Sequence, residues 1–133
     1  MFEFVKNDTG NAAPVIKEIA ATTAKYAVGD TLTLDAPTGL LKLCTGTEKP
    51  HFISAASKEV TAEDAVLAVN PVYPEQEWKT TFNADASTLK AGAAVTIAEN
   101  GNEVTATTSD GVFTIVEKLG TGAVGTEVIG KFL

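Results

Sequence analysis

Apolar and polar positions alternate along much of this chain, and one such pattern occurs twice. Residues 26–34 (YAVGDTLTL) are echoed by residues 89–97 (LKAGAAVTI). In each copy a glycine precedes a short alternating run, and alternation with period two is typical of a half-buried strand. A glycine at that place permits the turn that opens the strand. The sequence therefore predicts two related halves, about 26–57 and 89–117, each built as strand, turn and strand.

Further strands are expected around these segments, at about 40–45, 51–55, 65–69, 95–98, 103–107, 112–117 and 127–133. Asn100 and Gly101 are the strongest hairpin signal, because both tolerate the positive φ of a type I′ turn. A capping-like sequence at 61–64 permits a short helix, but Pro71 and Pro74 leave little room for one, so a turn into a strand is preferred. The predicted fold class is all-β, a small β-barrel or β-sandwich with two pseudo-repeated halves.

The inward members of these runs form the predicted core, which comprises Leu32, Leu34, Leu41, Leu43, Phe52, Val66, Val95, Ile97, Val104, Phe113, Ile115 and Val128. Residues 70–78 join the halves and are rich in proline and aromatic side chains. Because Trp78 and Phe82 favour burial, this segment is expected to be an ordered crossover within one domain.

The first 20 residues differ from the rest, and they are expected to form an extended N-terminal arm before a single β-domain over 21–133. The arm carries the candidate interface residues, which are all apolar: Phe2, Phe4, Val5, Val15, Ile16 and Ile19. These are too many for a tail that stays in water, since each large side chain gains about 1.5–3 kcal/mol on burial. The arm is therefore expected to pack on a neighbour, and a frayed terminus is the alternative.

Composition and charge narrow the classes of partner. The 133 residues fit one domain, and 44% hydrophobic with 20% charged residues is a globular composition. The net charge is −7 and all ten basic residues are lysines, which argues against nucleic acid and anionic membranes and favours a basic protein surface. No apolar run reaches the length of a membrane span, and the first residues lack the features of a secretory signal.

Candidate chemistry is sparse. Cys44 and His51 are the one pair that resembles a nucleophile and a base, but no orienting group lies in a recognisable motif. We therefore favour a buried, inert thiol for Cys44 and a position at the edge of a loop for His51. A zinc site cannot be built from one His and one Cys, and the acidic pairs Glu63 with Asp64 and Glu75 with Glu77 lack a calcium-loop pattern. The loop 120–125 has no following helix and no Lys-Ser/Thr pair for a nucleotide. An aromatic sugar platform of Trp78, Tyr73 and Tyr26 is considered less plausible than packing. We predict no catalytic, metal or cofactor-binding residue.

Three segments together carry a family resemblance over about residues 20–133. They are the opening YAVGDTLTL, the echo LKAGAAVTI and the ending GTEVIGKFL. In style and spacing they resemble the small head-decoration proteins of tailed bacteriophages and related phage proteins with a β-barrel or β-tulip core. The resemblance implies a capsid-stabilising virion protein on the capsid surface, made in the bacterial host cytoplasm. It implies the major capsid protein as partner and a homo-oligomer, often a trimer, and it transfers no catalytic residue. The alternative function is a non-catalytic carbohydrate- or cell-surface-binding β-module.

Overall fold

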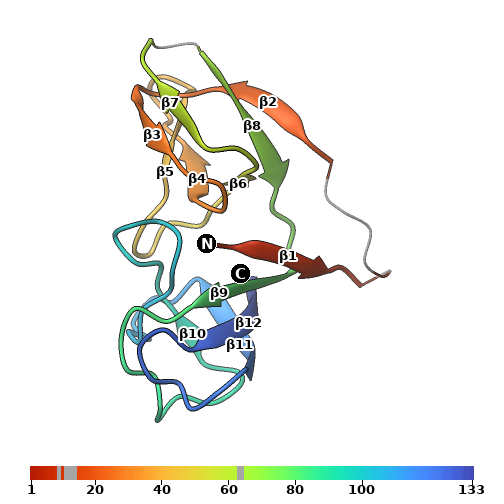
Figure 1. The fold of residues 1–133 in the computed structure, drawn as a ribbon, viewed down its shortest axis with the longest axis vertical. Helices are drawn as coiled ribbons and strands as arrows, with labels where there is room; N and C mark the ends of the chain where they lie inside the picture. The colour runs from red at the N-terminus through yellow and green to blue at the C-terminus, as the bar shows by residue number, and fades with distance from the viewer. Residues whose placement is uncertain (9, 11–14, 63–64) are drawn as a thin grey trace.

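The structure, a computed structural model, describes residues 1–8, 10, 15–62 and 65–133, and it consists of two β-lobes joined end to end (Figure 1). The first lobe contains β2 (Lys17–Ala20), β3 (Ala24–Tyr26), β4 (Thr31–Leu34), β5 (Leu41–Leu43), β6 (Phe52–Ser54), β7 (Lys58–Val60) and β8 (Val66–Pro71). The second lobe contains β1 (Glu3–Lys6), β9 (Glu77–Thr81), β10 (Ala94–Val95), β11 (Phe113–Lys118) and β12 (Glu127–Phe132). Among the described residues, no helix is long and apolar enough to cross a membrane.

Each lobe is organised around one antiparallel sheet of five strands. The order is β2-β8-β6-β4-β5 in the first lobe and β1-β9-β12-β11-β10 in the second, while β3 and β7 form a separate pair. The all-β prediction is confirmed. Of the two predicted forms, a β-sandwich-like arrangement is compatible with these sheets, whereas no sheet of the described residues is closed into a barrel. At the β10 end of the second sheet, the Thr105 N–H bonds the Thr96 carbonyl, and Val104 bonds on its other side to Thr81 and Asn83 at the end of β9, but these contacts are isolated bridges rather than a paired strand.

The strand pairings of the two lobes correspond in order and in register. The order β2-β8-β6-β4 in the first lobe parallels β9-β12-β11-β10 in the second. Corresponding partners lie 61 to 63 positions apart, as in Lys17–Val69 and Trp78–Gly130, and in Thr31–Ile53 and Ala94–Thr114. What differs is β1, which is added only to the second sheet; the place of β5 is taken in the second lobe by the segment at Val104 and Thr105, which bonds Thr96 without forming a strand of its own.

The two glycines of the repeated sequence pattern occupy the same kind of turn. Gly29 has φ 85° and Gly92 has φ 95°, in the left-handed region that a side chain disfavours. The turns are closed by N–H groups three residues after their acceptors, Asp30 to the Ala27 carbonyl and Ala93 to the Lys90 carbonyl, both at 3.1 Å. Each turn therefore places its glycine at the third position, where a type II turn requires positive φ.

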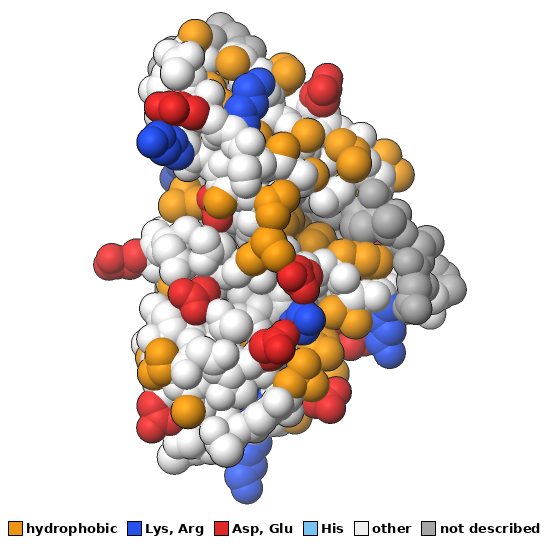
Figure 2. Space-filling model, in the orientation of Figure 1, with side chains coloured by type: hydrophobic (Ala, Val, Ile, Leu, Met, Phe, Trp, Pro, Cys, Tyr) orange, Lys and Arg blue, Asp and Glu red, His pale blue; other side chains and the backbone are white. Residues whose placement is uncertain are grey.

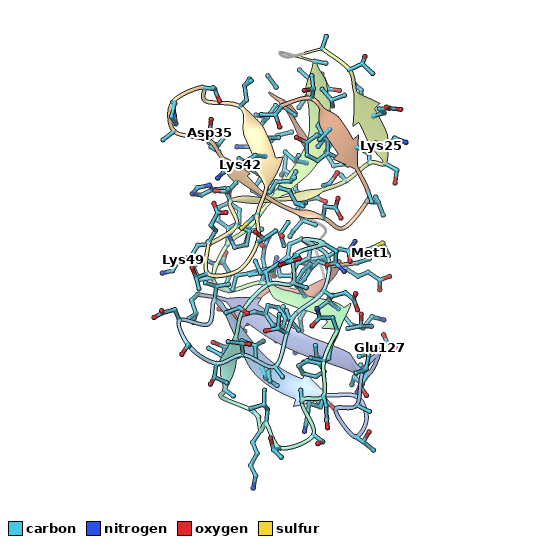
Figure 3. The ribbon with its side chains drawn as sticks, turned by 90° about the vertical axis from the view of Figure 1, so that its left-hand side faces the viewer. Met1, Lys25, Asp35, Lys42, Lys49 and Glu127 are labelled. Atoms are coloured by element: carbon cyan, nitrogen blue, oxygen red, sulfur yellow. The ribbon has the colours of Figure 1, made fainter. Side chains whose placement is uncertain are left out.

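The lobes pack against each other through side chains and backbone. Two residues of the first lobe, Cys44 and Ile53, belong to the apolar core of the second. The Thr31 hydroxyl donates to the Gly101 carbonyl at 2.7 Å, and Gly46 and Ile97 exchange two backbone hydrogen bonds of 2.9 Å. Figure 3 shows the result from the side, with Lys25 and Lys42 on the first lobe, Met1 at the junction and Glu127 on the second lobe.

The described part of the predicted arm contributes one edge strand to each sheet. Glu3–Lys6 is β1 and pairs with β9, whereas Lys17–Ala20 is β2 and pairs with β8. Phe2 is buried, and its ring lies 5.6 Å from that of Phe113 and 5.1 Å from that of Phe132. The two ends of residues 1–20 are thus built into different lobes.

Two local predictions are corrected by the structure. Leu34 and Val66 are expected in the core from the sequence but are about two-fifths exposed; in β8 the buried alternate positions are Leu67 and Val69, one residue out of the predicted register. Asn100 does not adopt positive φ. The Gly101 N–H instead bonds the Ala98 carbonyl at 2.9 Å with Gly101 left-handed, so the turn is not type I′.

Candidate functional site

Cys44 lies at the junction of the lobes as a fully buried thiol. Its Sγ donates to the Glu48 carbonyl oxygen at 3.3 Å. Burial, with a smaller contribution from the Glu48 carboxylate and partial opposition from Lys42, raises the pKa of the thiol to about 12. A thiol with so high a pKa is almost wholly protonated at neutral pH and is a poor nucleophile.

His51 does not reach Cys44 as a base. The order β6-β4-β5 places β4 between them, because Cys44 follows β5 and His51 precedes β6. The His51 Nδ1 lies 2.9 Å from the Thr33 hydroxyl and accepts the Leu34 N–H at 3.4 Å, which assigns the ring proton to Nε2. His51 therefore forms hydrogen bonds at the end of β4, and the structure does not bring Cys44 and His51 together.

Of the acidic candidates from the sequence, Glu77 has an ion-pair partner. Glu63 and Asp64 lie outside the described residues, and Glu77 forms an ion pair with Lys6 at 3.6 Å. Within the described part of the chain, no group of three His, Cys, Asp or Glu side chains is placed to hold a metal. The glycine loop 120–125 is followed by β12 rather than by a helix.

The aromatic residues do not form a common platform. Tyr26 is buried in the core of the first lobe, where its hydroxyl bonds Thr22 and the Leu41 carbonyl. Trp78 is buried in the core of the second lobe, and Tyr73 is about half exposed. A ligand stacked on all three rings is incompatible with these positions.

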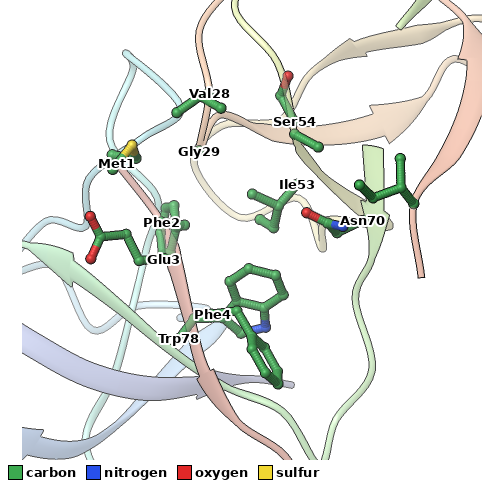
Figure 4. Close-up of a pocket in the computed structure, with 12 residues that line it drawn as sticks. Met1, Phe2, Glu3, Phe4, Val28, Gly29, Ile53, Ser54, Asn70 and Trp78 are labelled. Carbon is green, nitrogen blue, oxygen red and sulfur yellow. The ribbon is translucent and has the colours of Figure 1, made fainter. Parts of the chain in front are cut away.

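A mostly apolar pocket of about 440 Å³ opens between the lobes (Figure 4). β1 forms one wall, and the opposite wall comes from the turn at Gly29, the end of β6 and Asn70 of β8. Its volume falls in the range of small-molecule sites. The Asn70 carboxamide faces the space between Ile53 and Trp78.

One polar group in this pocket has no hydrogen-bond partner. Trp78 is 1% exposed, and its indole Nε1 is buried without a hydrogen-bond acceptor. The Phe4 ring meets the indole edge to face, with centroids 5.6 Å apart. An aromatic ring is a weaker acceptor for an N–H group than an oxygen.

The six candidate interface residues are divided between buried and exposed positions. Phe2 is buried, and the partly buried members of the set are Phe4, Val5 and Ile19. Val15 and Ile16 are 71% and 63% exposed, and they lie immediately before β2. Ile16 also lines the inter-lobe pocket. Of the six candidate interface residues, the exposed ones are therefore this pair.

The exposed pair belongs to a larger apolar surface at the junction of the lobes. We define the junction patch as Met1, Val15, Ile16 and Val28, all exposed, three of which line the pocket. Figure 2 shows apolar side chains gathered where the two lobes meet. Contiguous apolar surface on a soluble protein marks an interaction site more often than scattered single residues do.

Sequence reasoning named Val15 and Ile16 but missed Val28, Met1 and the pocket. The pocket depends on β1 folding back onto β9, a pairing between residues more than 70 positions apart. The alternation of Phe2 and Phe4 was the available signal for a strand in the arm.

The sequence matches no family model, and a search of the curated proteins finds no similar sequence.

Proposed function

We propose that this protein is a structural component of a tailed-phage virion that binds the outer surface of the capsid and stabilises it. The observation that carries the proposal is the exposed junction patch, in particular Val15 and Ile16 beside the free edge of β2. Burying such side chains against a partner gains about 1.5–3 kcal/mol each. The proposal also rests on the sequence resemblance, which supplies the class of partner.

The surface charge supports the same partner. The chain carries a net charge of −7, so a basic site on the major capsid protein is the complementary surface. The attraction between exposed charges is screened over about 8–10 Å at physiological salt. Binding to capsids should therefore weaken as salt rises, while the apolar contribution remains.

We also propose that the two lobes are copies of one structural unit. The support is the shared strand order, the spacing of 61 to 63 positions between corresponding paired residues and the two matching glycine turns. Under this proposal only the second unit is extended, by β1. The homo-oligomer, with a trimer as the form the resemblance favours, and the capsid-surface location are parts of the same functional proposal.

The test is co-sedimentation with phage heads that lack the protein. Ile16→Asp and Val15→Asp each place a charge in the junction patch and should reduce binding by at least tenfold. Val124→Asp is the matched control, because Val124 is 67% exposed on a loop of the second lobe outside the patch. Equal binding of all three variants and the unaltered protein would contradict the proposal. Point variants are preferable to deletion of residues 1–20, which removes β1 and β2 together.

One observation favours the alternative of a carbohydrate- or cell-surface-binding module. The inter-lobe pocket has the volume of a small-molecule site, and the aromatic residues Phe4 and Trp78 are among those that line it. Glycan-array binding that is lost in Trp78→Phe, with no binding to heads, would establish this alternative.

A further inference from the structure

The outer edge of β2 is available for another strand. β2 is the terminal strand of its sheet, and its residues 17–20 pair with β8; just beyond its end, Ala21 forms a parallel bridge with Leu41 of β5, and the Thr22 N–H donates to the Leu41 carbonyl at 2.9 Å. The Ala21 N–H donates inward to the Ala65 carbonyl at 3.0 Å, just beyond the end of β2. Because backbone groups of a strand alternate in direction, Glu18 directs its N–H and C=O groups outward. The available part of the edge is residues 16–18, since the bridge between Ala21 and Leu41 covers its other end.

The corresponding edge of the second lobe is already covered. β9 corresponds to β2, and β1 adds to the outer side of β9. The pairs across that junction are Glu3–Lys79, Phe4–Trp78 and Lys6–Glu77. Two of them are ion pairs, of 3.3 Å between Lys79 and Glu3 and 3.6 Å between Lys6 and Glu77. In the second lobe, therefore, an added strand with side chains of opposite charge completes this kind of edge.

The side chains on the β2 edge are charged and apolar but unmatched. With the spacing of 61 positions, Lys79 corresponds to Glu18, Trp78 to Lys17 and Glu77 to Ile16. Neither Lys17 nor Glu18 forms an ion pair within the described part of the chain, and both are exposed. An edge that only had to repel other strands would carry charge without the exposed Val15 and Ile16 beside it.

We propose that the β2 edge binds an extended segment of a partner protein by strand addition. The segment runs antiparallel to β2, with Lys or Arg opposite Glu18, Asp or Glu opposite Lys17, and a β-branched apolar residue opposite Ile16. Backbone hydrogen bonds supply part of the affinity, and the opposed side chains supply the specificity. The inference rests on the proposed correspondence of the two lobes and is independent of whether the partner is a capsid protein.

A second copy of β1 does not fit this edge. In the register of the second lobe it would place Glu3 opposite Glu18, and like charges directly opposite each other destabilise a strand pair. It would also place Phe4 opposite Lys17 and Lys6 opposite Ile16. The occupant is therefore a segment of another protein, with the charge order opposite to that of β1.

Peptide titration followed by amide NMR tests this proposal. The probe is the capped peptide TKETVT, whose Lys, Glu and Val fall opposite Glu18, Lys17 and Ile16, with one residue bulged as in β1. We expect saturable shifts in the amides of residues 16–20 and binding about fivefold or more tighter than that of the charge-swapped peptide TEKTVT. The double variant Lys17→Glu with Glu18→Lys should reverse this preference. Shifts confined to other residues, no binding at millimolar peptide or an unreversed preference would overturn the proposal.

Two matched controls separate strand addition from general attraction to an acidic protein. N-methylation of the peptide Lys removes the N–H that faces Glu18 and should abolish binding, whereas N-methylation of the peptide Glu alters an N–H that points away and should leave it within about twofold. Glu59→Lys changes the same charge at an exposed position on β7 and should not alter the preference. Equal effects of the two methylations would overturn strand addition. Head binding that fails while the peptide still binds counts against the capsid proposal alone.

Discussion

Replacing Phe2 by alanine tests whether the start of the chain is part of the folded body. Phe2 is 3% exposed and contacts the rings of Phe113 and Phe132 at centroid distances of 5.6 and 5.1 Å. Its N–H also donates to the Gly29 carbonyl at 3.0 Å, which ties β1 to the first lobe. A frayed arm would have none of these contacts.

The expected loss can be worked out from these contacts. Truncating a buried Phe to Ala costs about 3–5 kcal/mol, and each lost aromatic pair contributes about 0.5–1.5 kcal/mol of that total beyond area burial. A residue near a chain end can relax more easily than one in mid-sheet, so we expect the lower part of the range, about 3 kcal/mol. With a urea m-value of about 2 kcal/mol/M for a domain of this size, the unfolding midpoint should fall by about 1.5 M.

The assay is urea unfolding followed by the fluorescence of Trp78, the single tryptophan, which is buried on β9 and reports exposure of the core. Val15→Ala is the control from the same 20 residues. Because Val15 is 71% exposed, its truncation should change the free energy of unfolding by less than about 0.5 kcal/mol. A loss below about 1 kcal/mol for Phe2→Ala would refute the docking of the N-terminal segment.

Three further predictions concern the turns and the candidate residues. Gly92→Ala should lower the free energy of unfolding by about 1–2 kcal/mol through its positive φ alone, because the space around it is open. Gly29→Ala should cost more, because its Cβ would also lie 2.9 Å from the Phe2 nitrogen. Equal losses in urea unfolding would contradict this difference between the surroundings of the two glycines. Cys44 should resist a disulfide-exchange reagent at pH 8 in the native protein and react once urea unfolds it, since its pKa is raised to about 12; rapid native reaction would show that the thiol is not buried. His51→Ala should retain head binding in co-sedimentation, because its ring serves the end of β4, and loss of binding in a well-folded variant would reopen a functional role.

Local alternation was enough to predict the all-β class and several strands. Leu32, Val95 and Phe113 were all assigned to the core from such runs, and all three are buried. Burial alternates around Phe113, whereas residues 31–33 and 95–98 are buried without interruption. The glycine before each repeated run signalled a turn, and Gly29 and Gly92 adopt positive φ as such turns require. These features depend on neighbours in sequence and can be inferred from it.

Long-range pairing was not predictable in the same way. β1 meets β9 across more than 70 residues, and nothing local specifies that partner. In β8 an apolar residue occupies almost every position, so that alternation could not choose between Val66 and Leu67 as the inward side chain. The junction patch and the pocket follow from how the lobes meet, and they became visible only once the sheets were placed.

The capsid proposal requires that a phage encodes this chain, and its most direct test is quantitative mass spectrometry of the purified virions of that phage. A capsid-surface protein should be present in a fixed ratio to the major capsid protein and should remain with heads from which tails have been removed. Absence from virions, or a few copies that leave with the tails, would contradict the proposal and favour a receptor- or carbohydrate-binding role.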